Sequence, residues 1–178
     1  MSNACITIDC KDWISTVTID NPPANYLDRN LLAHLNKTVS DMLASKADLR
    51  VVLLKAKGRN FSAGIDYPGF VKMTKDEAGH FADVGYHLLR NIESLPVPVI
   101  AAVKGETTGA GLGLALAADI RIAAADAVFS FPEAQFGVPP VRVPGRVDRG
   151  AAGGALPGPA VAAAWVVVLQ CRPAVGVG

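Results

Sequence analysis

Two short apolar runs, residues 51–56 and 99–103, each lead into a turn that is rich in small residues. The first turn, residues 61–66, reads FSAGID, and the second, residues 105–113, reads GETTGAGLG. Small residues let backbone N–H groups approach a ligand closely, because no side chain stands in the way. We therefore expect strands that end in turns able to direct two backbone donors at one atom, which is how an oxyanion hole is built.

Strands and helices alternate along the chain up to about residue 131. Asp28 is placed to cap a helix ending at Ala44, because a short polar side chain before a periodic apolar stripe marks a helix start. The other predicted elements are a hairpin of residues 6–9 and 13–19, helices over about 75–94 and 111–118, and short strands over 120–122 and 128–131. This alternation predicts an α/β fold with helices shielding the sheets. Periodicity alone does not separate a doubly wound sheet from a spiral of ββα units.

Length and charge exclude several classes of function. At 178 residues the chain is long enough for one domain with a buried core. Its net charge of +1 does not suggest the basic surface that binds nucleic acid. The three cysteines have no metal-ligand spacing, and their odd number argues against a disulfide framework. The start of the chain has no secretory pattern, and the longest apolar run, residues 161–169, is short of a bilayer span of about 20 residues. We expect a cytoplasmic protein with no membrane segment and no metal site.

The composition changes abruptly near Pro140. Ala, Gly, Val, Pro and Arg supply 32 of the 38 residues from 141 to 178, and Lys, Glu, Ser and Thr are absent there. We expect a core domain over residues 1–140 and an atypical tail over 141–178, for which no secondary structure is predicted. This composition is typical of a shifted reading frame in a GC-rich gene, and a native Pro/Gly-rich tail is the alternative.

Four segments together resemble the crotonase family, also called the enoyl-CoA hydratase/isomerase family. They are residues 61–66, 104–111, 114–123 and 132–137, and the resemblance extends over about residues 5–140. It implies a spiral of ββα turns, an enzyme acting on acyl-CoA thioesters, and a homotrimer or hexamer for the full-length protein. Members of the family continue with mostly helical sequence. The resemblance therefore also implies that the C-terminal helical region is missing or scrambled in this chain.

The same resemblance assigns roles to individual residues. The backbone N–H groups of Ile65 and Ala110 match the family's two oxyanion donors, and Glu133 matches one of its two acid–base glutamates. The residues that the resemblance places along the acyl-CoA are Ala24, Leu27, Ser62, Ala63, Ile65, Asp66, Gly109 and Ala110. Coenzyme A is part of the substrate, so no separate cofactor is expected. Ala110 keeps the N–H but would be strained if the loop required a positive φ there.

Gly113 stands where the resemblance places the family's second glutamate. Water addition calls for a carboxylate pair, whereas a single carboxyl is enough for a 1,3 proton shift. The departure therefore favours double-bond isomerisation, with enoyl-CoA hydration as the alternative. Asp66 and Tyr67 are the nearby candidates for a second group, although the resemblance gives Asp66 a role in shaping the turn.

Three features of the sequence allow more than one interpretation. Lys55, Lys57 and Arg59 either meet the CoA phosphates or form an ordinary solvated basic edge. The glycines of the second turn resemble part of a dinucleotide-binding fingerprint, but Leu114 stands where its third glycine belongs. The atypical tail leaves open an inactive fragment rather than an enzyme, because the site would then lack its C-terminal walls.

Overall fold

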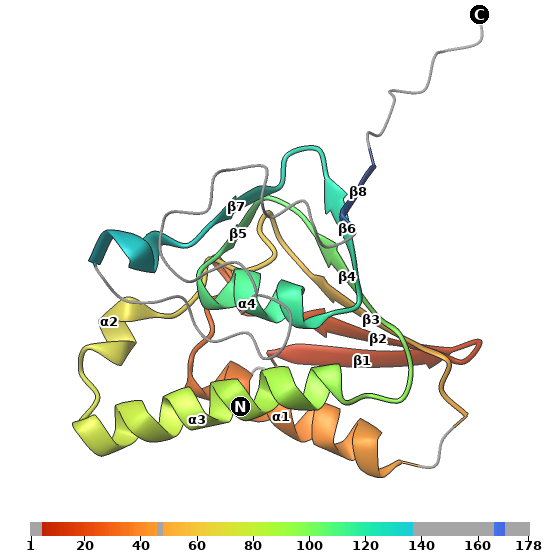
Figure 1. Cartoon of the computed structure of the whole chain (residues 1–178), viewed down its shortest axis with the longest axis horizontal. Helices are drawn as coiled ribbons and strands as arrows, with labels where there is room; N and C mark the ends of the chain where they lie inside the picture. The colour runs from red at the N-terminus through yellow and green to blue at the C-terminus, as the bar shows by residue number, and fades with distance from the viewer. Residues whose placement is uncertain (1–4, 46–47, 137–165, 170–178) are drawn as a thin grey trace, which may run out of the picture.

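The computed structural model describes residues 5–45, 48–136 and 166–169, which form two sheets with helices packed against them (Figure 1). The larger sheet has six strands in the order β1-β2-β3-β4-β6-β8. They are β1 (Ile6–Lys11), β2 (Ile14–Ile19), β3 (Val51–Ala56), β4 (Val99–Val103), β6 (Ile120–Ala124) and β8 (Val166–Leu169). β1 and β2 form the predicted antiparallel hairpin, and the other neighbouring strands pair in parallel.

The two long helices are amphipathic and capped at their starts. α1 (Arg29–Ala44) begins after Asp28, whose side chain accepts a hydrogen bond from Leu31 N at 2.8 Å, so the predicted cap is confirmed. α3 (Lys75–Glu93) begins with a capping box, in which the side chains of Thr74 and Glu77 each accept from the other's backbone N–H. The two helices lie side by side (Figure 1), and their apolar stripes are buried in the core.

A two-stranded parallel sheet carries the chain from the larger sheet toward the turns. It consists of β5 (Glu106–Thr108) and β7 (Val128–Ser130). β5 is followed by α4 (Ala110–Ala117), which is almost wholly buried, and β7 by the short 3-10 helix η1 (Pro132–Phe136). The chain thus passes twice from a strand of the larger sheet to a strand of the smaller one and then to a helix. This repeat is the ββα unit that the resemblance implied.

Several short elements were not predicted from the sequence. They are α2 (Tyr67–Phe70), β5, η1 and β8. β8 lies in the tail, where the expectation of no secondary structure is wrong for these four residues, because they pair in parallel with β6. The rest of the tail lies outside the described residues, so the boundary at residue 140 stays a prediction. Within the described ranges, no helix has the length and apolar character needed to cross a membrane.

Candidate active site

The two small-residue turns lie against each other. Ser62 forms an isolated parallel bridge with Thr107, in which Thr108 N donates to the Ser62 carbonyl at 3.0 Å and Ser62 N donates to the Glu106 carbonyl at 3.2 Å. Gly111 lies so near that an added Cβ would be 2.6 Å from the Ser62 carbonyl oxygen. The small residues therefore allow two segments of backbone to meet.

Gly64 and Gly109 hold the turns in conformations that favour glycine, with φ of +86° and +53°. A Cβ on Gly64 would lie 2.9 Å from the Thr108 carbonyl oxygen and 3.6 Å from Ala110 N. The described non-glycine residues with positive φ are Asp12, Trp13 and Asn25. Ala110 is not among them, so the strain considered for it does not arise: Gly109 makes the turn and Ala110 begins α4.

The N–H groups of Ile65 and Ala110 donate to no acceptor among the residues that the structure describes, although their neighbours do. Gly64 N donates to Ser62 Oγ at 3.2 Å, and Gly109 N donates to the Ser130 carbonyl at 2.9 Å. Since a Cβ added to Gly64 would lie 3.6 Å from Ala110 N, these two donors belong to neighbouring parts of the paired turns. Two such donors can stabilise an oxygen atom that gains negative charge.

The carboxylate of Glu133 lies directly beside the second turn. Glu133 is carried by η1 and is only 6% exposed. A Cβ added to Gly109 would collide with Glu133 Oε1 and would lie 3.1 Å from its Cδ, so the carboxylate occupies the space that a side chain at 109 would fill. Oε2 is buried and has no hydrogen-bond partner among the described residues. A buried oxygen of this kind is costly to leave unpaired and is therefore suited to a ligand's proton.

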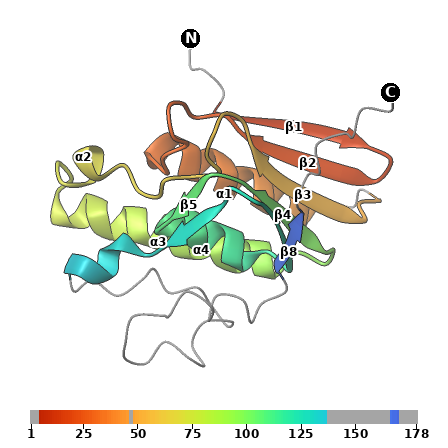
Figure 2. The ribbon, with the colours of Figure 1, turned by 90° about the horizontal axis from the view of Figure 1, so that it is seen from above.

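Tyr67, the first residue of α2, lies near enough to this carboxylate to feel its charge. Figures 1 and 2 place α2 and η1 at one end of the molecule, where α3 begins. Burial raises the pKa of the Tyr67 phenol, and the negative charge of nearby Glu133 raises it further. The phenol therefore stays protonated at neutral pH.

The loop before α1 lies beside the first turn. Ala63 N donates to the Ala24 carbonyl at 3.0 Å, and Leu27 N donates to the Gly64 carbonyl at 2.8 Å. The structure therefore brings Ala24 and Leu27 together with Ser62 and Ala63, two of the other residues predicted to lie along the acyl-CoA.

Asn25 fixes this arrangement and was missed in the sequence. Its Nδ2 donates to the carbonyls of Lys57 and Asn60, both at 2.9 Å, and its own carbonyl accepts from Ser62 Oγ at 2.7 Å. The residue is buried with φ of +53°. An asparagine after two prolines was the available signal, because asparagine tolerates a left-handed backbone better than most residues.

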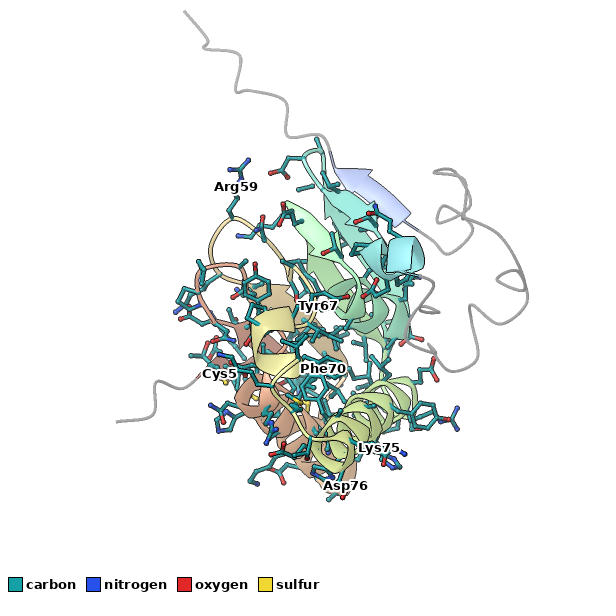
Figure 3. The ribbon with its side chains drawn as sticks, turned by 90° about the vertical axis from the view of Figure 1, so that its left-hand side faces the viewer. Cys5, Arg59, Tyr67, Phe70, Lys75 and Asp76 are labelled. Atoms are coloured by element: carbon teal, nitrogen blue, oxygen red, sulfur yellow. The ribbon has the colours of Figure 1, made fainter. Side chains whose placement is uncertain are left out.

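Asp66 and the basic residues Lys55, Lys57 and Arg59 make other contacts or face solvent. The Asp66 carboxylate packs over Gly69 of α2, where an added Cβ would lie 3.2 Å from its Cγ, and it makes no capping hydrogen bond. Lys57 pairs with Asp20 at 2.7 Å. Lys55 and Arg59 are exposed, and Arg59 projects from the loop after β3, at the opposite end of the view from Lys75 and Asp76 (Figure 3).

A cavity of about 270 Å³ lies beside the site, but the charged side chain of the site, Glu133, does not line it. It opens between the starts of α1, α2 and α3, with Met73 and Phe81 on its apolar side. Leu27 and Asp66 also line it, whereas Ala110 and Glu133 do not. The second donor and the carboxylate at the turns therefore lie outside this cavity.

Proteins of similar sequence decide the family. The profile of the family described as Enoyl-CoA hydratase/isomerase matches residues 9–152. The chain belongs to this family. Its α/β fold is the crotonase fold, since solved enoyl-CoA hydratases superpose on it.

Two curated relatives and one solved structure illustrate the likeness. The chain is 38% identical over 136 residues to the Bacillus subtilis "Probable enoyl-CoA hydratase", and the match covers 76% of this chain and 52% of that protein. It is 34% identical over 136 residues to the short-chain-enoyl-CoA hydratase of Clostridium acetobutylicum, with the same shares covered. The enoyl-CoA hydratase of Thermoplasma volcanium superposes with a TM-score of 0.71 at 33% identity, covering 78% of this chain and 55% of that one. The chain thus spans about half the length of the curated relatives it matches.

Proposed function

We propose that this chain binds an acyl-CoA thioester with the carbonyl oxygen between the N–H groups of Ile65 and Ala110, and that Glu133 moves a proton at the adjacent carbon. The observation that carries the proposal is the buried carboxylate of Glu133 against Gly109, one residue from the second donor. Removing that proton places negative charge on the carbonyl oxygen. Each fixed donor to such an oxygen lowers the barrier by about 2.7–4 kcal/mol.

Double-bond isomerisation is the reaction that this single carboxylate suits best. Glu133 takes a proton from C2 of a 3-enoyl-CoA, and the C–H electron pair forms the C1–C2 double bond of a dienolate. The same carboxyl then returns the proton to C4, the C2–C3 double bond forms, and the carbonyl is restored. Every proton that leaves the substrate comes back to it, so no second acid or base is required.

Hydration is the alternative, and the names of the relatives favour it. The Bacillus subtilis and Clostridium acetobutylicum proteins are both named as enoyl-CoA hydratases. Water addition to a 2-enoyl-CoA needs a group to hold the water while C2 is protonated. Gly113 lies within buried α4 and offers no carboxylate there, which is why we place isomerisation first.

The remainder of the proposal concerns the rest of the substrate and the assembly. Exposed Lys55 and Arg59 are proposed to meet the CoA phosphates, to which ionic hydrogen bonds are strong. Coenzyme A is the substrate's own carrier, and the reaction above uses no further cofactor. For the full-length protein we propose a cytoplasmic homotrimer or hexamer, on the resemblance to the family alone.

Incubation of the chain with 3-butenoyl-CoA and, separately, with crotonyl-CoA in heavy water tests the proposal. Mass spectrometry and NMR should show 3-butenoyl-CoA converted to crotonyl-CoA. Glu133→Gln should slow the conversion at least about 100-fold, the usual contribution of a general base. A folded wild-type chain that neither converts 3-butenoyl-CoA nor exchanges its C2 protons would refute the function and indicate an inactive fragment. Hydration of crotonyl-CoA faster than isomerisation would reverse our preference.

A further inference from the structure

The direction of the first donor is set by the two peptide groups on either side of Gly64. The carbonyl of Gly64 accepts from Leu27 N at 2.8 Å, and Gly64 N donates to Ser62 Oγ at 3.2 Å. A peptide unit is planar, and its C=O and N–H point in opposite directions, so the bond to the Gly64 carbonyl also fixes where the Ile65 N–H points. The aim of this donor therefore depends on how firmly Gly64 is held at both of its backbone groups.

The Ser62 hydroxyl is enclosed by the protein itself. It donates to the Asn25 carbonyl at 2.7 Å and accepts from Gly64 N. On the side of α4, a Cβ added to Gly111 would lie 2.7 Å from Ser62 Oγ. Because Ser62 is 0% exposed and its hydroxyl bonds the backbone, this side chain acts on the turn rather than on a ligand.

Asn25 is a firmly held anchor for this hydroxyl. Its side chain donates to the carbonyls of Lys57 and Asn60, both at 2.9 Å, and accepts from Asn21 N at 2.9 Å. Asn25 is also buried, so water does not compete for these bonds. The Ser62 hydroxyl therefore joins the first turn to a loop that is itself bonded at several points.

We propose that Ser62 is a positioning residue for the first oxyanion donor: its hydroxyl ties the backbone of Gly64 to the loop before α1 and so aims the Ile65 N–H at the thioester oxygen. The proposal rests on the function proposed above. Gly64 has φ of +86°, and a glycine that loses this bond is free to rotate toward other conformations. The Ile65 N–H would then remain present but poorly aligned, and a misaligned donor stabilises the developing charge less.

Ser62→Ala tests this role, with Ser15→Ala as the matched control. Ser15 is 1% exposed, accepts from Cys10 Sγ at 3.6 Å and lies on β2, which supplies no residue of the site. For 3-butenoyl-CoA isomerisation we expect Ser62→Ala to lower kcat about tenfold, less than the loss of about 100–1,000-fold for a donor removed outright. KM should change less than about threefold, because the donor acts mainly on the transition state. Ser15→Ala should keep the kcat and KM of the wild type.

A spectroscopic readout that needs no turnover separates the alignment of the donor from the stability of the fold. Butyryl-CoA labelled with carbon-13 at the thioester carbonyl has no double bond to move, and its isotope-edited infrared spectrum reports how strongly the carbonyl is polarised. Donors aimed at the oxygen lower the stretching frequency. The band of bound butyryl-CoA should therefore lie below that of the free thioester in the wild type and in Ser15→Ala, and closer to the free value in Ser62→Ala.

The outcomes distinguish this role from the proposed function. If the wild type is active and folded Ser62→Ala keeps either its kcat or its carbonyl band, the positioning role fails alone. If Ser62→Ala does not fold, Ser62→Cys takes its place, because a thiol is a weaker donor and acceptor; it should show both effects to a smaller degree, and wild-type values would overturn the role. A wild type that shifts the band without isomerising the substrate would contradict proton transfer by Glu133 and leave the band to decide the role of Ser62. If the folded wild type does neither, the proposed function fails, and the positioning role with it.

Discussion

Replacing Gly109 with alanine should strain the second turn and displace the Glu133 carboxylate. Gly109 precedes α4 with φ of +53° and ψ of −126°, a conformation that residues with a Cβ rarely adopt. The strain alone should lower the free energy of unfolding by about 1–3 kcal/mol. In addition, the new methyl group would collide with Glu133 Oε1 and lie 3.1 Å from Cδ and 3.3 Å from Oε2.

The collision has a separate effect on catalysis. The carboxylate must move by about the size of the overlap, and a misplacement on the order of 1 Å can cost about 100-fold in rate. We therefore expect Gly109→Ala to reduce 3-butenoyl-CoA isomerisation about 100-fold at temperatures where the variant is still folded. Urea denaturation measures the stability, and the ultraviolet absorbance of the conjugated product measures the rate.

Gly85→Ala is the matched control for this substitution. Gly85 lies within α3, and an added Cβ there would meet nothing within 4 Å. Because glycine in a helix interior is less favourable than alanine, this variant should gain up to about 1 kcal/mol of stability and keep its activity. If Gly109→Ala behaves like Gly85→Ala in both assays, the placement of Glu133 against residue 109 is wrong.

Three further substitutions test other parts of the structure. Hydrogen bonds from the Thr74 backbone, and then from Arg29, lower the pKa of Glu77. The contribution of Glu77 to stability is therefore present above the ordinary pKa of 4.5 and is lost as pH falls through the lower folded value. The stability advantage of the wild type over Glu77→Gln, measured by urea denaturation, should shrink from pH 7 to pH 3, and a constant difference would contradict this. Arg59→Ala should weaken binding of a CoA ester about threefold but leave binding of the matching pantetheine ester unchanged by calorimetry, and equal losses would exclude a phosphate contact. Arg121→Met should cost about 2–4 kcal/mol in thermal unfolding, because the buried guanidinium donates to three carbonyls at the end of α4, and a loss under about 1 kcal/mol would refute that role.

The parts of the fold that the sequence predicted are those set by local chemistry. β3 and β4 match the predicted ranges because each is an apolar run bounded by glycine, proline or charged residues. α1 begins where Asp28 predicted, since a capping side chain acts within its own first turn. These signals need no partner from elsewhere in the chain.

The parts that were missed depend on residues far away in sequence. β5 is a short polar segment that is a strand because β7 pairs with it. α2 contains a proline and a glycine, which are typical of a loop. The closeness of Tyr67 and Glu133 brings together two elements that no periodicity connects, although Tyr67 was among the candidates for a second group. The assignment of Glu133 itself came from the resemblance to the family, because a glutamate after a proline carries no signal of its own.

The composition of the site bears on which family reaction it can perform. Isomerisation passes one proton between two carbons of the substrate and back through one carboxylate. Hydration must hold a water molecule as well, and the group that does so must accept hydrogen bonds from it or take its proton. In the described site the only proton acceptor beside Gly109 is Glu133, and its polar neighbour is a phenol that keeps its own proton. A second acceptor introduced by Gly113→Glu should therefore raise hydration relative to isomerisation if the variant folds, and an unchanged product ratio would show that the missing carboxylate does not select the reaction.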